Sequence, residues 1–311
     1  MPMFSVVVPA HNSTATLGQT LDSLISQSFV DWEAVILDDA STDGTYELAS
    51  RYAEIDGRVR VIRLDRSGPS LARNTGVLEF SGAEWIAFLD ADDIWAQDKL
   101  ARTAKEIRAT RAAAFYARIA FFRHAPDSAT TLSTVKSAAL SPYDLLCENA
   151  VCTLSNLVVR RDAFLAAGGF DPKVVHGEDV EFMIRLAAGG GRIASIDEVL
   201  VYYRASDSGL SADLVSMREG WEAALATMRR LGLPVETAAV RHAQAIHLRY
   251  LARRALRVRV PRFTALRLAA RAMRISPSGF FSDPRRAVLT VCAAFAEPFM
   301  PSRLRRCAFD R

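Results

Sequence analysis

The sequence contains little cysteine and no hydrophobic run long enough to cross a membrane. No apolar stretch approaches the roughly 20 residues of a transmembrane helix, and residues 1–4 lack the basic region of a signal peptide. The four cysteines show no zinc-ligand spacing, so we expect reduced thiols in a cytoplasmic protein. They are Cys147, Cys152, Cys292 and Cys307.

Two common nucleotide-binding motifs are also absent. No G-x-G-x-x-G follows the first expected strand, and the pattern G-x-x-x-x-G-K-[ST] occurs nowhere in the chain. These motifs hold the phosphates of dinucleotides and of nucleoside triphosphates. Ordinary dinucleotide-dependent and P-loop enzymes are therefore disfavoured.

Acidic and basic residues are unevenly distributed. Residues 1–205 hold 20 Lys and Arg against 27 Asp and Glu, whereas residues 206–311 hold 19 Arg, no Lys and 8 acids. The net charge of +4 thus combines an acidic body with a basic C-terminal third. A basic segment of this kind indicates an anionic partner, either a membrane surface or a nucleic acid.

Hydrophobic runs and amphipathic patterns alternate through the first hundred residues. Runs at 4–8, 34–37, 59–64 and 85–89 predict buried strands, and Pro9 is expected to end the first one. Apolar residues at helical spacing lie between these runs. The alternation predicts an α/β fold with a doubly wound, mostly parallel sheet, which binds its ligands at the carboxyl ends of its strands.

The fourth strand ends in three carboxylates, Asp90, Asp92 and Asp93. Carboxylates at the carboxyl end of a central strand are typical ligands for a hard divalent cation. Asp is also a preferred helix N-cap, so Asp92 or Asp93 is equally suited to starting the next helix. On this stretch alone both interpretations stand.

Seven short motifs occur in order along residues 3–211: VVVPAHN, LDDASTDG, ARNTG, FLDADD, GGFD, GED and YR. Together they resemble the family 2 inverting glycosyltransferases. The resemblance implies the GT-A fold for residues 1–211, followed by a basic α-helical region at 212–311. It further implies transfer of a sugar from a nucleotide donor, in the first place a UDP-sugar, during cell-surface polysaccharide synthesis.

The resemblance also assigns residues to the nucleotide. Pro9, His11 and Asn12 match the loop that packs against the base, with His11 where many relatives have Tyr. Asp39 matches the residue that accepts a hydrogen bond from the base, a role that suits an acceptor-only carboxylate. Arg73 matches a cationic residue near the nucleotide, and its alternative is an exposed arginine on a helix.

Metal and catalytic residues follow from the same resemblance. Asp92, with Asp90, matches the D-x-D motif that coordinates Mn²⁺ or Mg²⁺, and Asp90 is also expected to contact the ribose. Asp179 matches the general base, and its alternative is an acid placed at a helix N-terminus by the macrodipole. Glu178 is expected to orient the acceptor or to be structural.

One departure from the family pattern concerns the end of the YR motif. Relatives often continue to a His that approaches the metal or phosphate, whereas this chain has Ser206. Arg204 is expected to supply compensating positive charge. Ser208 and Ser211 fall in the segment that closes over the donor in relatives.

The basic C-terminal region contains regularly spaced arginines. Arg241, Arg249, Arg253 and Arg257 lie at multiples of four and predict one cationic stripe on a helix. Basic amphipathic helices favour attachment to the inner membrane face, and an ordinary helical subdomain is the alternative. Nucleic acid is disfavoured as the partner, because aromatic residues are not interleaved with the arginines.

The predicted function is therefore a metal-dependent inverting glycosyltransferase that acts on a glycan or polyprenyl-diphosphate-linked acceptor. Two alternatives belong to other classes. A sugar-1-phosphate nucleotidyltransferase normally carries a Gly-rich basic loop after its first strand, and Pro9 to Asn12 do not form one. A nucleotide-sugar-binding protein without catalysis is disfavoured by the presence of both Asp92 and Asp179.

Overall fold

A computed structural model describes residues 1–300 apart from 124, 130, 206–212 and 259. The chain divides into an N-terminal unit, Met1–Leu140 with Ala150–Ser206, and a C-terminal unit, Ser141–Asn149 with Asp207–Arg311. The short segment 141–149 thus belongs with the C-terminal helices, an association that no local sequence pattern indicates. Ser206, Ser208 and Ser211 lie outside the described residues.

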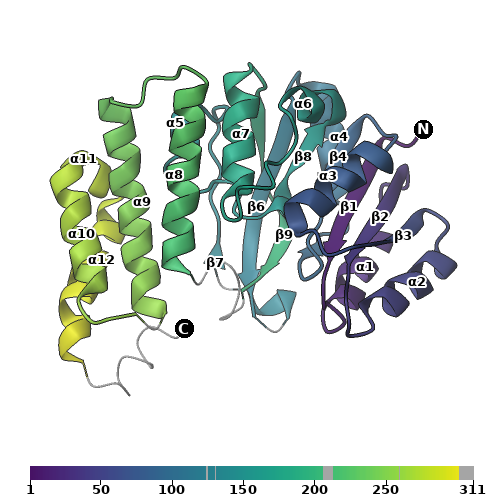
Figure 1. Cartoon of the computed structure of the whole chain (residues 1–311), viewed down its shortest axis with the longest axis horizontal. Helices are drawn as coiled ribbons and strands as arrows, with labels where there is room; N and C mark the ends of the chain where they lie inside the picture. Colours follow the sequence, from purple (N-terminus) through teal and green to yellow (C-terminus); the bar gives the residue numbers. More distant parts are fainter. Residues whose placement is uncertain (124, 130, 206–212, 259, 301–311) are drawn as a thin grey trace. The chain divides into compact units, whose positions relative to one another are not determined.

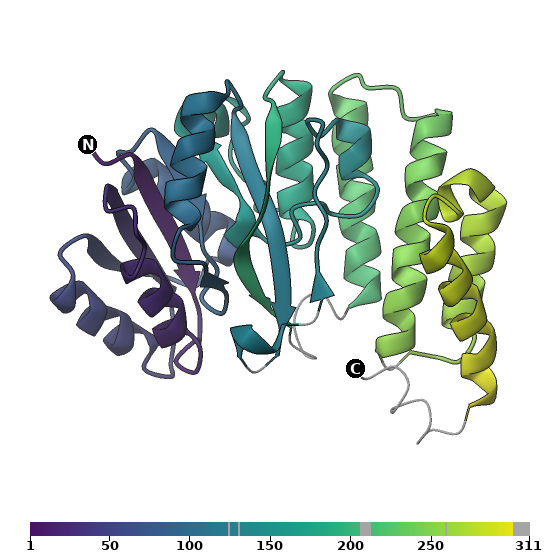
Figure 2. The same cartoon turned by 180° about the vertical axis from the view of Figure 1, so that it is seen from behind.

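One sheet runs through the N-terminal unit, and its strand order is β3-β2-β1-β4-β8-β6-β9-β5, with β7 paired to β6 (Figures 1 and 2). The strands are β1 (Phe4–Ala10), β2 (Trp32–Asp39), β3 (Val59–Leu64), β4 (Trp85–Phe88), β5 (Ile94–Trp95), β6 (Ala114–Phe122), β7 (Thr131–Leu132), β8 (Val158–Arg160) and β9 (Ile193–Arg204). The long ladders, β1–β2, β2–β3, β1–β4 and β6–β9, are parallel. The pairs that β8 forms with β4 and β6 are antiparallel and short. The predicted mostly parallel α/β sheet is confirmed.

Strand β1 continues through Pro9 to Ala10, so the prediction that Pro9 ends this strand was wrong. Val7 O accepts a hydrogen bond from Leu89 N on the β4 side, and the β1–β4 pairing stops at Val7. The missing N–H of Pro9 faces the same side, beyond the end of that ladder. Proline is tolerated in the strand because no ladder bond is lost there.

Helices pack on both faces of this sheet, as a doubly wound fold requires. They are α1 (Leu17–Ile25), α2 (Thr45–Ile55), α3 (Pro69–Glu79), α4 (Lys99–Ala109), α6 (Arg161–Ala166) and α7 (Glu178–Ala188), with the 3₁₀ turns η1 (Pro126–Ser128) and η2 (Leu154–Asn156). Helices α1, α2 and α4 share a core with Val6 and Val8. On the other face, α3 lies so close to Val7 that a Cβ on Gly76 would come within 2.7 Å of Val7 Cγ1.

Four aromatic rings form the core beneath α6 and α7. Phe88, Phe164, Phe170 and Phe182 are all buried, and their ring centroids lie 5.0–5.8 Å apart in edge-to-face or tilted pairs. This packing fixes α7 over the end of β4.

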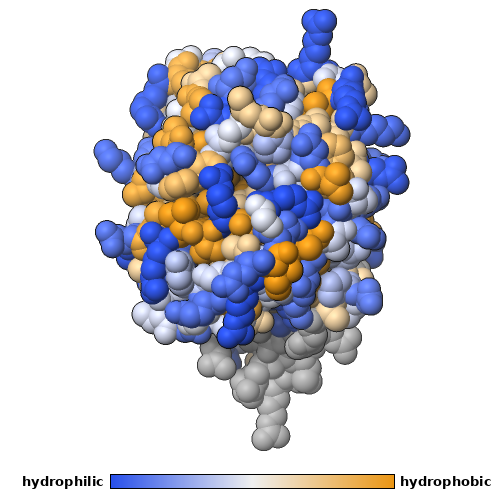
Figure 3. Space-filling model, turned by 90° about the vertical axis from the view of Figure 1, so that its right-hand side faces the viewer, coloured by the Kyte–Doolittle hydropathy of each residue, from blue (hydrophilic) through white to orange (hydrophobic). Residues whose placement is uncertain are grey.

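Hydrophilic and hydrophobic residues are interspersed on the surface seen from the β3 end of the sheet (Figure 3).

The C-terminal unit consists of helices, α5 (Pro142–Leu145), α8 (Leu214–Arg230), α9 (Ala238–Arg257), α10 (Thr264–Ile275), α11 (Pro277–Phe280), α12 (Pro284–Ala296) and the 3₁₀ turn η4 (Glu297–Phe299). Buried residues such as Leu248, Leu251 and Phe280 form its core. None of the helices in the described part of the chain is both long and apolar enough to cross a membrane.

Only part of the predicted cationic stripe on α9 is solvent-exposed, namely Arg241 and Arg257 at its two ends. Arg249 is only 2% exposed, and its guanidinium donates to Phe280 O at 2.5 Å. Glu148 forms ion pairs with Arg249 at 3.5 Å and with Arg286 at 3.0 Å. The spacing of four placed these arginines on one side of the helix correctly, but that side packs partly against other elements of the unit.

Candidate active site

The carboxyl ends of β1 and β2 meet at a polar loop. Nδ1 of His11 lies 2.7 Å from Asp39 O, and its Nε2 lies 2.5 Å from Arg66 Nη1. Since the carbonyl can only accept and the guanidinium can only donate, the ring proton belongs on Nδ1. Asn12 has a left-handed φ of 49° and accepts from Thr42 N, so it ties the first loop to the second.

The Asp39 carboxylate is buried and holds the loop before α3. Oδ1 accepts from Ser67 N at 2.6 Å and from Ser67 Oγ at 2.9 Å, while Oδ2 accepts from Gly68 N at 2.9 Å. A carboxylate oxygen has two lone pairs, so Oδ2 retains one acceptor position for a ligand N–H. Pro9, within β1, is partly exposed beside this loop.

Arg73 connects two parts of the site that are far apart in sequence. Its guanidinium lies 2.5 Å from Asp90 Oδ1 at the end of β4 and 3.4 Å from Glu178 at the start of α7. The residue is 5% exposed, which rules out the alternative of an exposed surface arginine. Burial alone would lower the pKa of Arg73, but Asp90, Glu178 and Asp179 outweigh that effect and raise it.

In the loop that follows β4, Asp92 is the carboxylate that is open to solvent. Among the described residues it has no ion-pair partner, and its side chain is exposed on one side. The protein around its other side removes hydration, and Asp90 adds negative charge, so the pKa of Asp92 rises to about 6. Positive charge placed beside Asp92 would relieve this unfavourable crowding of carboxylates.

Asp93 is buried and does not cap a helix, so that prediction was wrong. The following residues form β5, and α4 begins only at Lys99. Asp93 Oδ1 accepts from Arg204 N at 3.0 Å, and Oδ2 lies 3.1 Å from the Thr153 hydroxyl. Burial, followed by Asp92 and Asp90, raises the pKa of Asp93 well above its usual value.

The Thr153 hydroxyl indicates where the proton of Asp93 lies. Its oxygen is 3.0 Å from Asp90 Oδ2 and 3.1 Å from Asp93 Oδ2. A hydroxyl has one proton, so it can donate to only one of the two carboxyl groups. Burial favours the neutral form of Asp93, and a proton on Asp93 would let this residue donate to the Thr153 oxygen while Thr153 donates to Asp90. Asp93 and Thr153 thus brace the loop together.

Arg204, at the end of β9, supports the same loop from the other side. It donates from Nε to Asp92 O at 2.9 Å and from Nη2 to Gln19 Oε1 at 2.7 Å. Its guanidinium also stacks 4.6 Å from the Phe122 ring centre. The positive charge lowers the pKa of Asp92, although less than burial and Asp90 raise it.

Asp179 and Glu178 occupy the first turn of α7. Asp179 Oδ1 accepts from Val180 N at 2.8 Å, an arrangement that the helix-terminal interpretation also predicts. Burial and the adjacent charge of Asp179 raise the pKa of Glu178 to about 7. The two acids therefore differ, since Glu178 faces Arg73 and titrates near neutrality.

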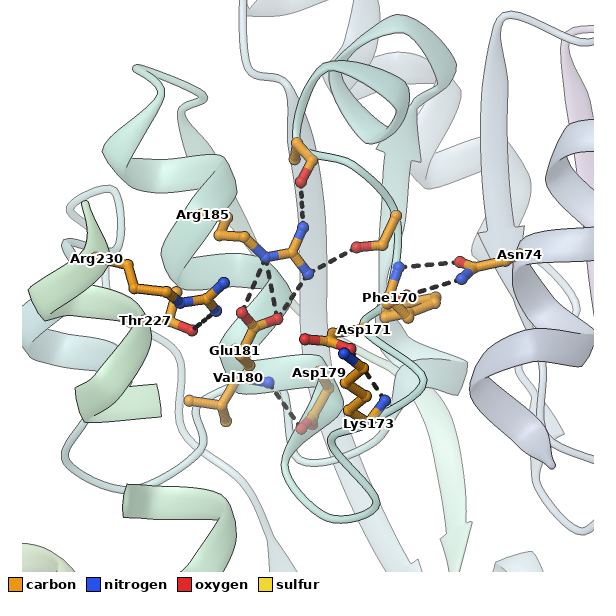
Figure 4. A network of polar contacts seen from close by, with 12 residues as sticks. Asn74, Phe170, Asp171, Lys173, Asp179, Val180, Glu181, Arg185, Thr227 and Arg230 are labelled. Carbon is orange, nitrogen blue, oxygen red and sulfur yellow. Dashed lines mark hydrogen bonds and ion pairs between the residues drawn. The ribbon is translucent and has the colours of Figure 1, made fainter. Parts of the chain in front are cut away.

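The turn before α7 is pinned to α3 and to α7 itself (Figure 4). Asn74 exchanges two hydrogen bonds with the backbone of Phe170, at 2.7 and 2.9 Å. Arg185 is held by Glu181 and donates to the carbonyls of Ala167 and Gly169. Because Asn74 follows Arg73 on α3, one helix positions both Asp90 and the start of α7.

The carboxylates of the β4 loop suit a hard divalent cation in part. No cluster of three or more His, Cys, Asp and Glu side chains with metal-binding geometry occurs in the described residues. Asp90 and Asp92 nevertheless present carboxylate oxygens, and burial together with the negative charge of Asp90 raises the pKa of Asp92. Such a pair fits a cation that takes its remaining ligands from phosphate and water.

Three polar residues of the site, Thr153, Ser155 and Arg66, were not predicted from the sequence. Thr153 lies in a stretch without clear periodicity, and only the polar residues around Ser155 in an otherwise apolar segment marked it. Ser155 Oγ accepts from Asp90 N at 2.9 Å. Arg66, beside His11, carried no motif.

Comparison with known proteins identifies the family. The family model described as Glycosyl transferase family 2 matches residues 5–165. The chain is 30% identical over 225 residues to the putative teichuronic acid biosynthesis glycosyltransferase TuaG of Bacillus subtilis (strain 168), covering 68% of this chain and 82% of TuaG. Other curated relatives are matched over 15% to 66% of their own length.

Two solved structures share the fold. One is S. aureus TarS 1–349 in complex with UDP-GlcNAc, with a TM-score of 0.64 and 20% identity over 95% of this chain and 88% of that one. The other is the mannosyltransferase PcManGT of Pyrobaculum calidifontis with GDP-Man and Mn²⁺, with a TM-score of 0.61 and 20% identity over 96% and 87%. The chain belongs to glycosyl transferase family 2 and is a glycosyltransferase with the GT-A fold.

Proposed function

We propose that this enzyme transfers a sugar, with inversion, from a nucleoside-diphosphate donor to a glycan or polyprenyl-diphosphate-linked acceptor of a cell-surface polysaccharide. The observation that carries the proposal is the position of Arg73, whose two ion pairs join Asp90 of the D-x-D loop to Glu178, the neighbour of Asp179. Residues suited to the donor diphosphate and to proton abstraction thus belong to one site.

The base of the donor is proposed to lie against His11, Pro9 and Asn12. The remaining acceptor position on Asp39 Oδ2 suits the imide N–H of uracil. Guanine also offers N–H donors, so this contact alone does not select the nucleotide. UDP is proposed as the nucleotide because TarS, one structural neighbour, was solved with UDP-GlcNAc. GDP is the competing nucleotide, since PcManGT was solved with GDP-Man.

Asp92, together with Asp90, would hold Mn²⁺ or Mg²⁺ in this site. When bound, such a cation stabilises the negative charge on the oxygens of the departing nucleoside diphosphate. Arg204 holds the Asp92 backbone, and Asp93 with Thr153 braces Asp90. The protein therefore keeps both carboxylates in place before the donor arrives.

Asp179 is proposed as the general base. It would accept the proton of the acceptor hydroxyl while that oxygen attacks the anomeric carbon opposite the leaving phosphate, which inverts the configuration. Glu178, which pairs with Arg73, is proposed to orient the acceptor. The competing assignment of Glu178 as the base predicts that Glu178→Gln abolishes transfer and that Asp179→Asn leaves it measurable.

The acceptor and location are also proposals. The excess of arginine in residues 206–311 suits the anionic inner face of the cell membrane, where a polyprenyl-linked acceptor would be presented. Nucleic acid is not proposed as a partner.

A donor screen tests the function. The purified protein is incubated with UDP- and GDP-sugars and extracted lipid-linked glycans, with Mn²⁺ or with EDTA, and products are identified by mass spectrometry. We expect transfer, or slow donor hydrolysis, with Mn²⁺ and none with EDTA. Donor binding without turnover under every condition would instead support a binding protein, and release of diphosphate from a nucleoside triphosphate and a sugar phosphate would support nucleotidyl transfer.

A further inference from the structure

Helix α12 presents an apolar stripe to solvent. Its inner side, Ala287, Thr290 and Ala294, is buried. On its outer side Val288, Leu289 and Phe295 are 53%, 60% and 63% exposed, and Phe299 in the following turn is 72% exposed. Large apolar side chains repeated on one side of a helix, and left uncovered by the described residues, mark an interaction surface.

Three of the exposed side chains are phenylalanines in mutual contact. The ring centroids of Phe295 and Phe299 lie 6.0 Å apart, and those of Phe299 and Phe263 lie 6.5 Å apart at 90°. Phe263 is 42% exposed. The rings thus form a continuous aromatic surface at the end of α12, where the chain approaches the start of α10; the two helices lie side by side in Figures 1 and 2.

Phe263 also has an unusual backbone. Its φ of 69° and ψ of −2° are left-handed, a conformation that costs free energy for a bulky residue. Glycine would avoid this cost at the helix start. Burial of the ring does not offset it, because nearly half of the side chain stays exposed. Backbone strain at an exposed aromatic side chain points to a role in binding.

The surroundings of these rings are strongly basic. Residues 257–300 contain eight arginines and two acids. Of the acids, Glu297 is 3% exposed and Asp283 pairs with Arg286 at 3.1 Å. No ion pair with a described residue is formed by the exposed arginines 262, 267, 271, 274 and 285. The surface therefore combines apolar rings with uncompensated positive charge.

We infer that Phe263, Val288, Leu289, Phe295 and Phe299, here called the C-terminal aromatic face, dock on an anionic lipid surface. The rings enter the boundary between headgroups and acyl chains, and the arginines contact lipid phosphates. A second copy of the chain fits less well, since a two-fold contact would bring unpaired arginines of both copies together. This inference rests on the proposed function only for its biological purpose, which is to bring the enzyme to a lipid-linked acceptor. The experiment below does not depend on that acceptor.

Vesicle co-sedimentation tests this surface with the full chain. Binding is measured to phosphatidylcholine vesicles with and without the anionic lipid phosphatidylglycerol. We expect binding that requires the anionic lipid and weakens in high salt. Phe295→Ser with Phe299→Ser should reduce the partition coefficient about tenfold or more, because two exposed rings no longer insert.

Leu78→Ser is the matched control, since Leu78 is 60% exposed on α3 and belongs to the other unit of the chain. It should leave vesicle binding unchanged. The double variant replaces only exposed side chains, and an unaltered circular dichroism spectrum shows that it is folded. Reversing the charge of Arg267 and Arg271 to Glu should weaken binding to anionic vesicles while the rings are intact.

Several results would overturn the inference. They are absence of binding by the unaltered chain, equal binding to neutral vesicles, and equal loss in the double variant and the control. A dimer that forms without lipid and is disrupted in the double variant would also overturn the inference. Tighter binding to an RNA oligonucleotide than to vesicles would do the same. Vesicle binding needs no turnover, and donor hydrolysis needs no vesicle, so failure of this inference is distinguishable from failure of the proposed glycosyl transfer.

Discussion

Removing the positive charge of Arg73 should destabilise the N-terminal unit in a pH-dependent manner. Arg73 is buried and lies between the carboxylates of Asp90 and Glu178, which are 25% and 16% exposed. Arg73→Met leaves these acids crowded without their cation. Breaking a buried pair by removing one partner typically costs about 3 kcal/mol or more when the remaining charge stays ionised.

The acids can escape part of this cost by taking up a proton. Glu178 already has a pKa of about 7 with Arg73 present, and loss of the cation raises it further. An acid with a raised folded pKa favours the folded state below its unfolded pKa, and this contribution is lost as pH rises through the folded value. The penalty of Arg73→Met should therefore be small near pH 5 and grow to about 3 kcal/mol by pH 8.

Hydrogen exchange of α3 and α7 peptides in increasing urea measures this penalty for the N-terminal unit alone. Arg73→Lys should give an intermediate value, because one ammonium cannot reach both acids as a guanidinium fork does. Arg60→Met is the control, since the Arg60–Glu33 pair lies at the surface. A penalty that is absent, or the same at pH 5 and pH 8, would refute the reasoning.

Two further predictions concern the C-terminal unit. Burial lowers the pKa of His247 to about 4, so the neutral imidazole stabilises the folded unit above pH 6.5 and this stabilisation is lost as pH falls through 4. The loss in the free energy of unfolding should reach about 3 kcal/mol. His247→Phe should remove this pH dependence, measured by hydrogen exchange of α9 amides. Glu148→Gln leaves buried Arg249 without its counter-charge and should cost about 3 kcal/mol by the same measurement. Glu222→Gln, at a surface pair with Arg218, should change little, and equal effects of the two substitutions would contradict the structure.

The sequence was sufficient for elements whose signals are local. The strands around Val7, Ile36 and Ile86 are runs of buried β-favouring residues, so their positions follow from the hydrophobic pattern. Their parallel direction follows from the helices expected between them. Asp179 likewise stands at the start of a predicted helix. Its catalytic role, and the nucleotide and metal roles of Asp39 and Asp92, remain predictions.

Long-range contacts are what the sequence did not reveal. Asp93 resembled a helix cap, but its partner is Arg204 N, 111 residues away. Arg249 resembled a surface charge, but Glu148, 101 residues earlier, meets it inside the unit. In both cases a polar residue is buried because a distant partner satisfies it, and a single sequence carries no local trace of that partner.

The most direct test of the account separates donor binding from proton abstraction. Calorimetric UDP binding, with and without Mn²⁺, is compared with sugar transfer in Asp92→Asn, Asp179→Asn and the surface control Asp197→Asn. We predict that Asp92→Asn loses the Mn²⁺-dependent gain in affinity, whereas Asp179→Asn binds UDP normally and transfers about 100-fold more slowly or less. Unchanged transfer by Asp179→Asn, or unchanged Mn²⁺ dependence in Asp92→Asn, would contradict the proposed division of roles.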